Sequence, residues 1–135
     1  YFKNKMLTPQ QIKSMKSRQK IVVLTAYDFP TAKLMEGIVD IILVGDSLGM
    51  VVLGYDSTTK VTMQDMIRAT GAVARAAKNT LIVGDMPIGT YDNEKDALKN
   101  ANLFLKAILQ KLSPSIRPSM PMTGVGYIAS PLFSL

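Results

Sequence analysis

Short runs of apolar residues alternate along this chain with segments in which apolar residues recur every three or four positions. Three of the runs have strand length and are rich in β-branched residues: they are residues 21–25, 41–44 and 81–83. The last two are uninterrupted aliphatic runs, which are typical of buried strands in parallel sheets. Because helical segments separate the runs, the pattern predicts an α/β fold, either a barrel or a doubly wound sheet.

The clearest helical pattern follows Thr62. Thr62 and Asp65 are spaced as in a capping box, which predicts that a helix begins here. One face of this predicted helix carries Met63, Met66, Ile67, Thr70, Val73, Ala74 and Ala77. A second long helix is predicted after Asp92 or Asn93, because either residue is a suitable N-cap. Its predicted inward face comprises Ala97, Leu98, Ala101, Leu105 and Ile108.

Shorter or irregular structure is expected elsewhere. A capping helix is predicted near 8–18, with Pro9 in its first turn, and another short helix is predicted to end near Gly37. Residues 45–62 are predicted to form a long irregular loop, of the kind that carries functional sites after parallel strands. Beyond the second long helix the period fails. A further strand is predicted at residues 120–124, and residues 126–135 read as a tail without a clear period.

Composition limits the chemistry that this chain can perform. The chain has 135 residues, of which 47% are hydrophobic, so we expect a single domain over residues 1–135. It contains no cysteine and no histidine. Disulfides, thiolate catalysis and cysteine metal sites are therefore excluded, and carboxylates, lysines and hydroxyl groups remain for catalysis. Such oxygen ligands favour Mg²⁺ or a similar hard ion.

The net charge of +6 has its origin in the first twenty residues, which hold no acidic side chain. The basic residues there are Lys3, Lys5, Lys13, Lys16, Arg18 and Lys20. So short a basic segment is more typical of a solvated helix face than of an element that binds nucleic acid or membrane. No apolar run approaches the roughly 20 residues of a membrane span, and the start lacks the layout of a secretory signal. We therefore expect a cytoplasmic protein that contacts neither nucleic acid nor membrane.

Two of the predicted strands lead into the same dipeptide, Gly45-Asp46 and Gly84-Asp85. Parallel neighbouring strands joined by a crossover helix bring their carboxyl ends to one edge of the sheet. A single Gly-Asp is more often a simple turn, but two on adjoining strands place two carboxylates close together. Such carboxylates repel each other unless they share a cation. The sequence thus predicts that Asp46 and Asp85 bind a divalent metal.

Ser47 and Lys111 complete the set of candidate site residues. Ser47 lies between Asp46 and Gly49, where a hydroxyl group and backbone N–H groups can meet a small anion. Lys111 is a candidate counter-charge for the carboxylate or enolate of a substrate. A solvated lysine late in a helix fits the same pattern at least as well.

Two long segments resemble a known family. Residues 22–34 read VVLTAYDFPTAKL, and residues 40–58 read DIILVGDSLGMVVLGYDST. With these motifs the chain is similar to ketopantoate hydroxymethyltransferase, also called 3-methyl-2-oxobutanoate hydroxymethyltransferase. The similarity continues through Asp85-Met86-Pro87 and covers roughly residues 8–110.

The resemblance implies a (β/α)₈ TIM barrel of the phosphoenolpyruvate/pyruvate superfamily, of which this chain is roughly the N-terminal half. It implies a homo-oligomer, a decamer in many members. The implied reaction transfers a hydroxymethyl group from 5,10-methylenetetrahydrofolate to 3-methyl-2-oxobutanoate. The product, 2-dehydropantoate, leads to pantothenate and coenzyme A.

The resemblance also assigns roles to residues. Asp46 and Asp85 are expected to hold Mg²⁺, Ser47 to bind the carboxylate of the keto acid, and Lys111 to add positive charge. The Mg²⁺ ion would chelate the keto acid and stabilise the enolate, which attacks the one-carbon unit of the folate.

The chain departs from the family pattern beyond Lys111. Ser113-Pro114 stands where the family has a glutamate near the metal, a later family histidine is absent, and the general base falls past residue 135. A TIM barrel takes about 250 residues, so we expect either a true fragment or a chain that lacks segments. One alternative is therefore a catalytically inactive half-barrel that serves as an assembly subunit. Another is a lyase or mutase of the same superfamily, which the run Gly45-Asp46-Ser47 and its continuation disfavour.

Overall fold

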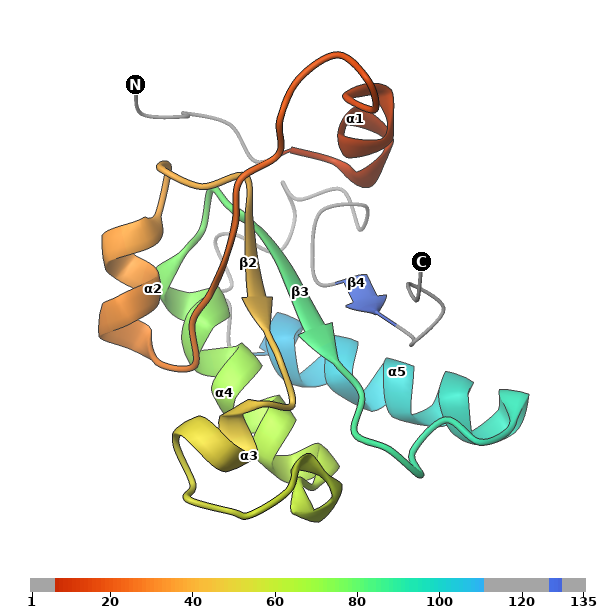
Figure 1. Cartoon of the computed structure of the whole chain (residues 1–135). Helices are drawn as coiled ribbons and strands as arrows, with labels where there is room; N and C mark the ends of the chain where they lie inside the picture. The colour runs from red at the N-terminus through yellow and green to blue at the C-terminus, as the bar shows by residue number, and fades with distance from the viewer. Residues whose placement is uncertain (1–6, 111–126, 130–135) are drawn as a thin grey trace.

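The molecule is built around a four-stranded parallel sheet, of which Figure 1 labels β2, β3 and β4. The computed structural model describes the backbone of residues 7–110 and 127–129 and the side chains of residues 7–106. The strands follow the order β1-β2-β3-β4, and all neighbouring pairs are parallel. They are β1 Val23–Thr25, β2 Ile41–Val44, β3 Leu81–Asp85 and β4 Tyr127–Ala129. The predicted α/β class is confirmed, and each of the three predicted runs at residues 21–25, 41–44 and 81–83 contains a strand.

Helices separate the strands along the chain. They are α1 Pro9–Ser14, α2 Phe29–Met35, α3 Leu48–Val51, α4 Met63–Ala76 and α5 Glu94–Gln110, with a 3₁₀ turn, η1, at Thr58–Lys60. Helices α2, α4 and α5 pack side by side, and α4 lies in the middle against β2 and β3. The core forms between this helix layer and the sheet. In the part of the chain that the structure describes, no helix is long and apolar enough to cross a membrane.

Helix α4 has the start and the buried face that the sequence predicts. The Thr62 hydroxyl accepts a hydrogen bond from the Asp65 backbone N–H at 3.2 Å, and the Asp65 carboxylate accepts one from the Thr62 N–H at 3.0 Å. This capping box satisfies donors that every helix start leaves free. It also holds the pKa of Asp65 below its ordinary value, because the Thr62 hydroxyl and N–H both donate to the carboxylate. Met66 and Val73, on the predicted face, are fully buried.

Helix α5 begins where it was predicted, but its inward face differs from the prediction at Leu98 and Phe104. Asn93 caps it, because its side-chain oxygen accepts a hydrogen bond from the Asp96 N–H at 2.9 Å. Leu98, predicted to point inward, is 58% exposed, whereas Phe104 is 1% exposed. Ala97, Ala101 and Leu105, which were predicted to point inward, are half-buried beside Phe104. The sequence prediction was therefore wrong for Leu98 and missed Phe104, while Ile108 lies outside the described side chains.

Three predicted segments differ in the structure. Residues 45–62, predicted to be irregular, contain α3 and η1, which pack against each other. The tail predicted from 126 to 135 was wrong at Tyr127–Ala129, because these residues form β4 beside β3. The helix predicted near 8–18 ends at Ser14, and Ser17, just beyond it, has a positive φ of 62° that no helix tolerates. The strand predicted at 120–124 lies outside the described residues.

Strand β1 shows that an apolar run alone does not determine burial. In the described part of the sheet it is the edge strand, with only β2 as a hydrogen-bonded neighbour. Val23 is 46% exposed and Leu24 is 48% exposed. On β2, by contrast, Ile42 and Val44 are fully buried beneath the helices. Position in the sheet therefore decides which of these apolar strands lies in the core.

Glu36 joins the end of α2 to the turn before β3. Its carboxylate accepts hydrogen bonds from the Lys78 backbone N–H at 2.9 Å and from the Asn79 side chain at 3.4 Å, and it is paired with Lys33. Burial raises the pKa of Glu36, but the hydrogen bonds from Lys33 and Lys78 together lower it by more. The pKa of Glu36 therefore lies below its ordinary value of 4.5. The ionised form therefore stabilises the fold.

We expect Glu36→Gln to lower the free energy of unfolding by about 0.5–1.5 kcal/mol at neutral pH, the net worth of such a hydrogen bond. A carboxyl group with a lowered pKa contributes stability above its unfolded-state pKa and loses it as the pH falls through the folded-state pKa. The difference in unfolding free energy between wild type and variant should therefore shrink as the pH falls below 4.5, the ordinary pKa of the group. Urea unfolding between neutral and acid pH measures it. The control is Asp56→Asn, whose exposed ion pair with Lys60 should contribute almost nothing at either pH. A pH-independent difference for Glu36→Gln would contradict the argument.

Candidate functional site

The carboxyl ends of β2 and β3 bring Asp46 and Asp85 together. In the parallel register of these strands, Val44 lies opposite Gly84, so the residues that follow lie at the same edge of the sheet. The backbone N–H of Asp46 donates a hydrogen bond to Oδ2 of Asp85 at 3.3 Å. The predicted meeting of the two acids at adjoining strand tips is confirmed. Their role as metal ligands stays a prediction.

Gly45 makes room for this arrangement. A Cβ atom on Gly45 would lie 2.9 Å from the Ser47 hydroxyl oxygen and 3.4 Å from Oδ2 of Asp85. The first distance is shorter than real Cβ contacts, so a side chain here would displace Ser47. The two distances also show that the Ser47 hydroxyl and the Asp85 carboxylate both lie over the Gly45 backbone. Glycine at this position thus lets a hydroxyl group and a carboxylate converge on one small space.

Ser47 occupies the N-cap position of α3, yet its side chain makes no capping hydrogen bond. Its hydroxyl group is instead hydrogen bonded to the hydroxyl group of Tyr27, with 2.8 Å between the oxygens. Tyr27 follows β1 directly after the buried Ala26, and its ring is partly buried against the core. The end of β1 therefore contributes to the same edge as the ends of β2 and β3.

Tyr27 was not among the residues that sequence reasoning selected for the site. One signal could have found it, since Tyr27 stands two residues beyond the end of β1, as Asp46 stands two residues beyond the end of β2. Parallel neighbouring strands present residues at equivalent positions to the same edge. Its polar tip on an aromatic ring is also suited to a place where the core meets a polar site.

The electrostatics of the site favour a bound cation. Burial raises the pKa of Asp85, and the negative charge of Asp46 raises it further, while the hydrogen bond from the Asp46 N–H lowers it in part. The net shift is upward, so the ionised carboxylate is less stable here than in water. A divalent cation would offset both causes, because it replaces lost solvation and neutralises the repulsion.

The donor set fits Mg²⁺ on chemical grounds. Two carboxylates at one sheet edge supply hard oxygen ligands, and Mg²⁺ commonly takes one or two carboxylates and completes its octahedral shell with water and substrate oxygens. Among the described side chains, no group of three or more acidic, histidine or cysteine residues could hold a metal ion. The site is therefore a two-carboxylate site within this part of the chain. Lys111, the remaining predicted site residue, lies outside the described residues.

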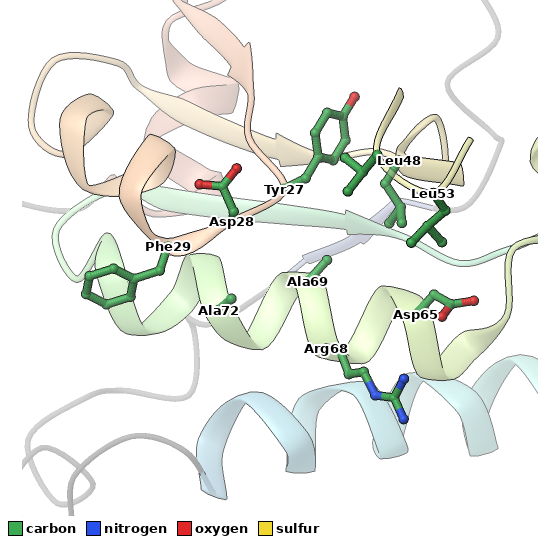
Figure 2. Close-up of a pocket in the computed structure, with 10 residues that line it drawn as sticks. Tyr27, Asp28, Phe29, Leu48, Leu53, Asp65, Arg68, Ala69 and Ala72 are labelled. Atoms are coloured by element: carbon green, nitrogen blue, oxygen red, sulfur yellow. The ribbon is translucent and has the colours of Figure 1, made fainter. Parts of the chain in front are cut away.

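A separate cavity lies beside the strand tips (Figure 2). It has a volume of about 310 Å³ and opens between the loop after β1, helix α3 and helix α4. Its lining is mostly apolar and comprises Tyr27, Asp28, Phe29, Leu48, Val52, Leu53, Asp65, Arg68, Ala69 and Ala72. Neither Asp46 nor Asp85 lines it, so we place the candidate chemistry at the strand tips and not in this cavity. The two are neighbours through Tyr27.

Comparison with known protein families gives one match that covers most of the chain. Residues 6–112 match the family described as ketopantoate hydroxymethyltransferase. The matched region contains Asp46, Ser47, Asp85 and Tyr27, and also Lys111.

Curated relatives share this description. The chain is 56% identical over 98 residues to a 3-methyl-2-oxobutanoate hydroxymethyltransferase of Ignicoccus hospitalis. The aligned region covers 71% of the chain and 37% of the relative. It is 59% identical over 103 residues to one of Aeropyrum pernix, covering 76% of the chain and 38% of the relative. It is 53% identical over 105 residues to one of Heliobacterium modesticaldum, with 76% and 38% covered. The chain thus spans less than two fifths of the length of these relatives.

Solved structures show the fold that the chain is similar to. One is 2,3-dimethylmalate lyase, a member of the PEP mutase/isocitrate lyase superfamily, with a TM-score of 0.54 and 15% identity over 76% of this chain and 36% of that one. Another is oxaloacetate acetylhydrolase, with a TM-score of 0.54 and 11% identity over 80% of this chain and 38% of that one. At these identities the likeness concerns the fold alone.

Proposed function

The chain belongs to the ketopantoate hydroxymethyltransferase family, and from this premise we propose that the protein containing it transfers a hydroxymethyl group to 3-methyl-2-oxobutanoate. The donor would be 5,10-methylenetetrahydrofolate and the product 2-dehydropantoate, on the way to pantothenate and coenzyme A. The proposal refers to the whole protein, because the chain spans 37–38% of its curated relatives. In it, this chain supplies the edge of the sheet where the keto acid binds.

The single observation that carries the proposal is the contact between the tips of β2 and β3. The Asp46 N–H and the Asp85 carboxylate are 3.3 Å apart, and this contact brings two acids to one point of the sheet edge. Asp46 and Asp85 would hold Mg²⁺ there. When bound, the ion would supply Lewis acidity that makes the C3 hydrogen of a chelated 2-oxo acid easier to remove.

The other residues of the site bind and orient the substrate. The Ser47 hydroxyl lies over Gly45 beside Asp85, and in this proposal it would donate a hydrogen bond to the carboxylate of the keto acid. Lys111 would add a positive charge that holds the same carboxylate. Asp46 contributes both its side chain and its backbone N–H, and the N–H bond to Asp85 orients the second carboxylate. Contacts within the fold hold Asp46, Ser47 and Asp85 in the absence of a ligand, and this would reduce the reorganisation that the reaction needs.

The remaining parts of the proposal follow the family. We propose a cytoplasmic homo-oligomer, a decamer as in many members, with the described sheet as part of a (β/α)₈ barrel. The partners are then the keto acid, the folate and further copies of the chain, without nucleic acid or membrane.

A catalytically inactive assembly subunit is the second candidate. The observation that favours it is the sequence after Lys111, where Ser113-Pro114 replaces the glutamate of the family pattern. The intact pair of strand-tip acids favours the enzyme instead, because a purely structural subunit gains nothing from two repelling carboxylates.

One experiment tests the proposal on the purified protein. Solvent deuterium should enter C3 of 3-methyl-2-oxobutanoate in the presence of Mg²⁺, and removal of the ion with a chelator should stop the exchange. Addition of 5,10-methylenetetrahydrofolate should then yield 2-dehydropantoate. Nuclear magnetic resonance of the keto acid follows both reactions. Absence of exchange and of product with Mg²⁺ present would rule out the enzyme and leave the assembly subunit.

A mass spectrum of the source polypeptide complements the exchange experiment, because a mass near 14.7 kDa favours the subunit.

A further inference from the structure

Tyr27 and Ser47 form a hydroxyl pair at the edge of the candidate site. Their oxygens are 2.8 Å apart, which is an ideal O–H···O distance, and the residues come from the ends of two different strands. The Tyr27 ring packs against the core cluster and is itself partly buried. Its hydroxyl group is therefore held at a fixed place by packing that does not depend on Ser47.

Ser47 stands at the N-cap position of α3 with helical backbone angles, and its side chain is directed to Tyr27 and not to the helix. Serine is a preferred N-cap residue, and its hydroxyl oxygen normally accepts a hydrogen bond from a backbone N–H of the helix that it starts. At Ser47 this bond is absent, and the hydroxyl is directed to Tyr27 over the backbone of Gly45. Gly45 makes this rotamer possible, because a Cβ there would lie only 2.9 Å from the hydroxyl oxygen. Gly45, Ser47 and Tyr27 thus act together to hold one hydroxyl group at the edge of the site.

Either hydroxyl group can donate in this bond, and the chemistry of the two groups favours Tyr27 as the donor. A hydroxyl group donates one hydrogen bond and accepts up to two. The phenol of tyrosine is far more acidic than the alcohol of serine, so it is the better donor of the pair. When Tyr27 donates, a lone pair of Ser47 is occupied and the Ser47 proton is free for another acceptor. The charged carboxylate of a ligand is the strongest acceptor that such a proton can find.

We propose that Tyr27 is a positioning residue that orients the Ser47 hydroxyl towards the carboxylate of a bound 2-oxo acid. The inference rests on the proposed function and adds to it a residue that selects the carboxylate of the substrate. Tyr27 acts through Ser47 and makes no contact with the reacting carbon. Its loss should therefore weaken the binding of ligands that carry a free carboxylate and leave other ligands unaffected.

The test compares two ligands on Tyr27→Phe, a variant that keeps the ring and removes only the hydroxyl group. Dissociation constants are measured by calorimetry with Mg²⁺ present, for 3-methyl-2-oxobutanoate and for its methyl ester. We expect the affinity for the acid to fall by about 3- to 10-fold, as for the loss of one supporting hydrogen bond. The affinity for the ester should change by less than about twofold, since the ester carries no charge for the Ser47 proton.

Controls separate positioning from folding. Tyr55→Phe removes the hydroxyl group of another partly buried tyrosine that packs against the core, and it should leave both dissociation constants unchanged. Ser47→Ala should show the same preference for acid over ester as Tyr27→Phe. In the double variant, Tyr27→Phe should cost nothing beyond Ser47→Ala, because coupled residues are not additive.

Each outcome decides the inference. An unchanged affinity of Tyr27→Phe for the acid overturns it, and so does an equal loss for acid and ester, which indicates a structural role. In both cases the proposed function survives if the wild type binds the acid. A wild type that binds neither ligand with Mg²⁺ present overturns the proposed function and this inference together.

Discussion

Replacement of Asp46 or Asp85 by alanine is expected to abolish the Mg²⁺-dependent exchange of the C3 hydrogen of 3-methyl-2-oxobutanoate. The two carboxylates converge through the 3.3 Å contact between the Asp46 N–H and the Asp85 carboxylate. Among the described side chains, no third acidic residue joins these two as a possible metal ligand. A single carboxylate binds Mg²⁺ weakly, so either substitution should reduce exchange by at least about 10²-fold, the usual effect of the loss of a key electrostatic group.

The measurement is proton loss at C3 in deuterium oxide, at several concentrations of Mg²⁺. Asp92→Ala is the matched control, because Asp92 is an exposed acid on the segment that follows β3 and should leave the exchange unchanged. Asp85→Asn excludes unfolding as the cause. Burial and the charge of Asp46 raise the pKa of Asp85, so the ionised Asp85 carboxylate does not stabilise the metal-free fold. Asp85→Asn removes the charge of Asp85 and should therefore not lower the unfolding temperature of the metal-free protein. Full exchange in both alanine variants would remove the metal assignment.

Phe104→Ala is expected to cause the largest loss of stability, about 3–5 kcal/mol, which is typical of truncating a buried phenylalanine. Phe104 is 1% exposed and heads the fully buried side chains of the described chain by volume. Its ring lies over β3, where a Cβ on Gly84 would meet two of its carbon atoms at 2.7 Å. Alanine would leave a cavity between α5 and the strand that carries Asp85. Urea unfolding of the purified protein measures the loss.

The neighbouring residue on the same helix supplies the control. Leu103 is 46% exposed, so Leu103→Ala should change the free energy of unfolding far less, by at most about 1 kcal/mol. The comparison keeps the helix, its propensity and its position along the chain nearly constant. Equal losses in the two variants would show that α5 does not pack in the observed orientation. If Phe104→Ala is too unstable to purify, this result agrees with the expectation. The same result for Leu103→Ala would contradict it.

The site was predictable to the extent that it depends on strand ends. The dipeptides Gly45-Asp46 and Gly84-Asp85 mark two strand tips, and parallel pairing brings such tips to one edge whatever the details of packing. Tyr27 was missed because its partner, Ser47, is 20 residues away in sequence, and no periodicity relates two hydroxyl groups across a sheet edge. Its contribution depends on the rotamers of both side chains, which packing against the core decides.

The sequence by itself determined the α/β class, the starts of α1, α4 and α5, and the meeting of Asp46 with Asp85. These features arise from local rules, since a cap needs only its next three residues and a parallel strand needs only its length and apolar run. Tertiary structure alone decided the exposure of β1, the burial of Phe104 in place of Leu98, and the pairing of Tyr127–Ala129 with β3. Each of these depends on which surface a segment meets, and burial is set by neighbours that are distant in the chain.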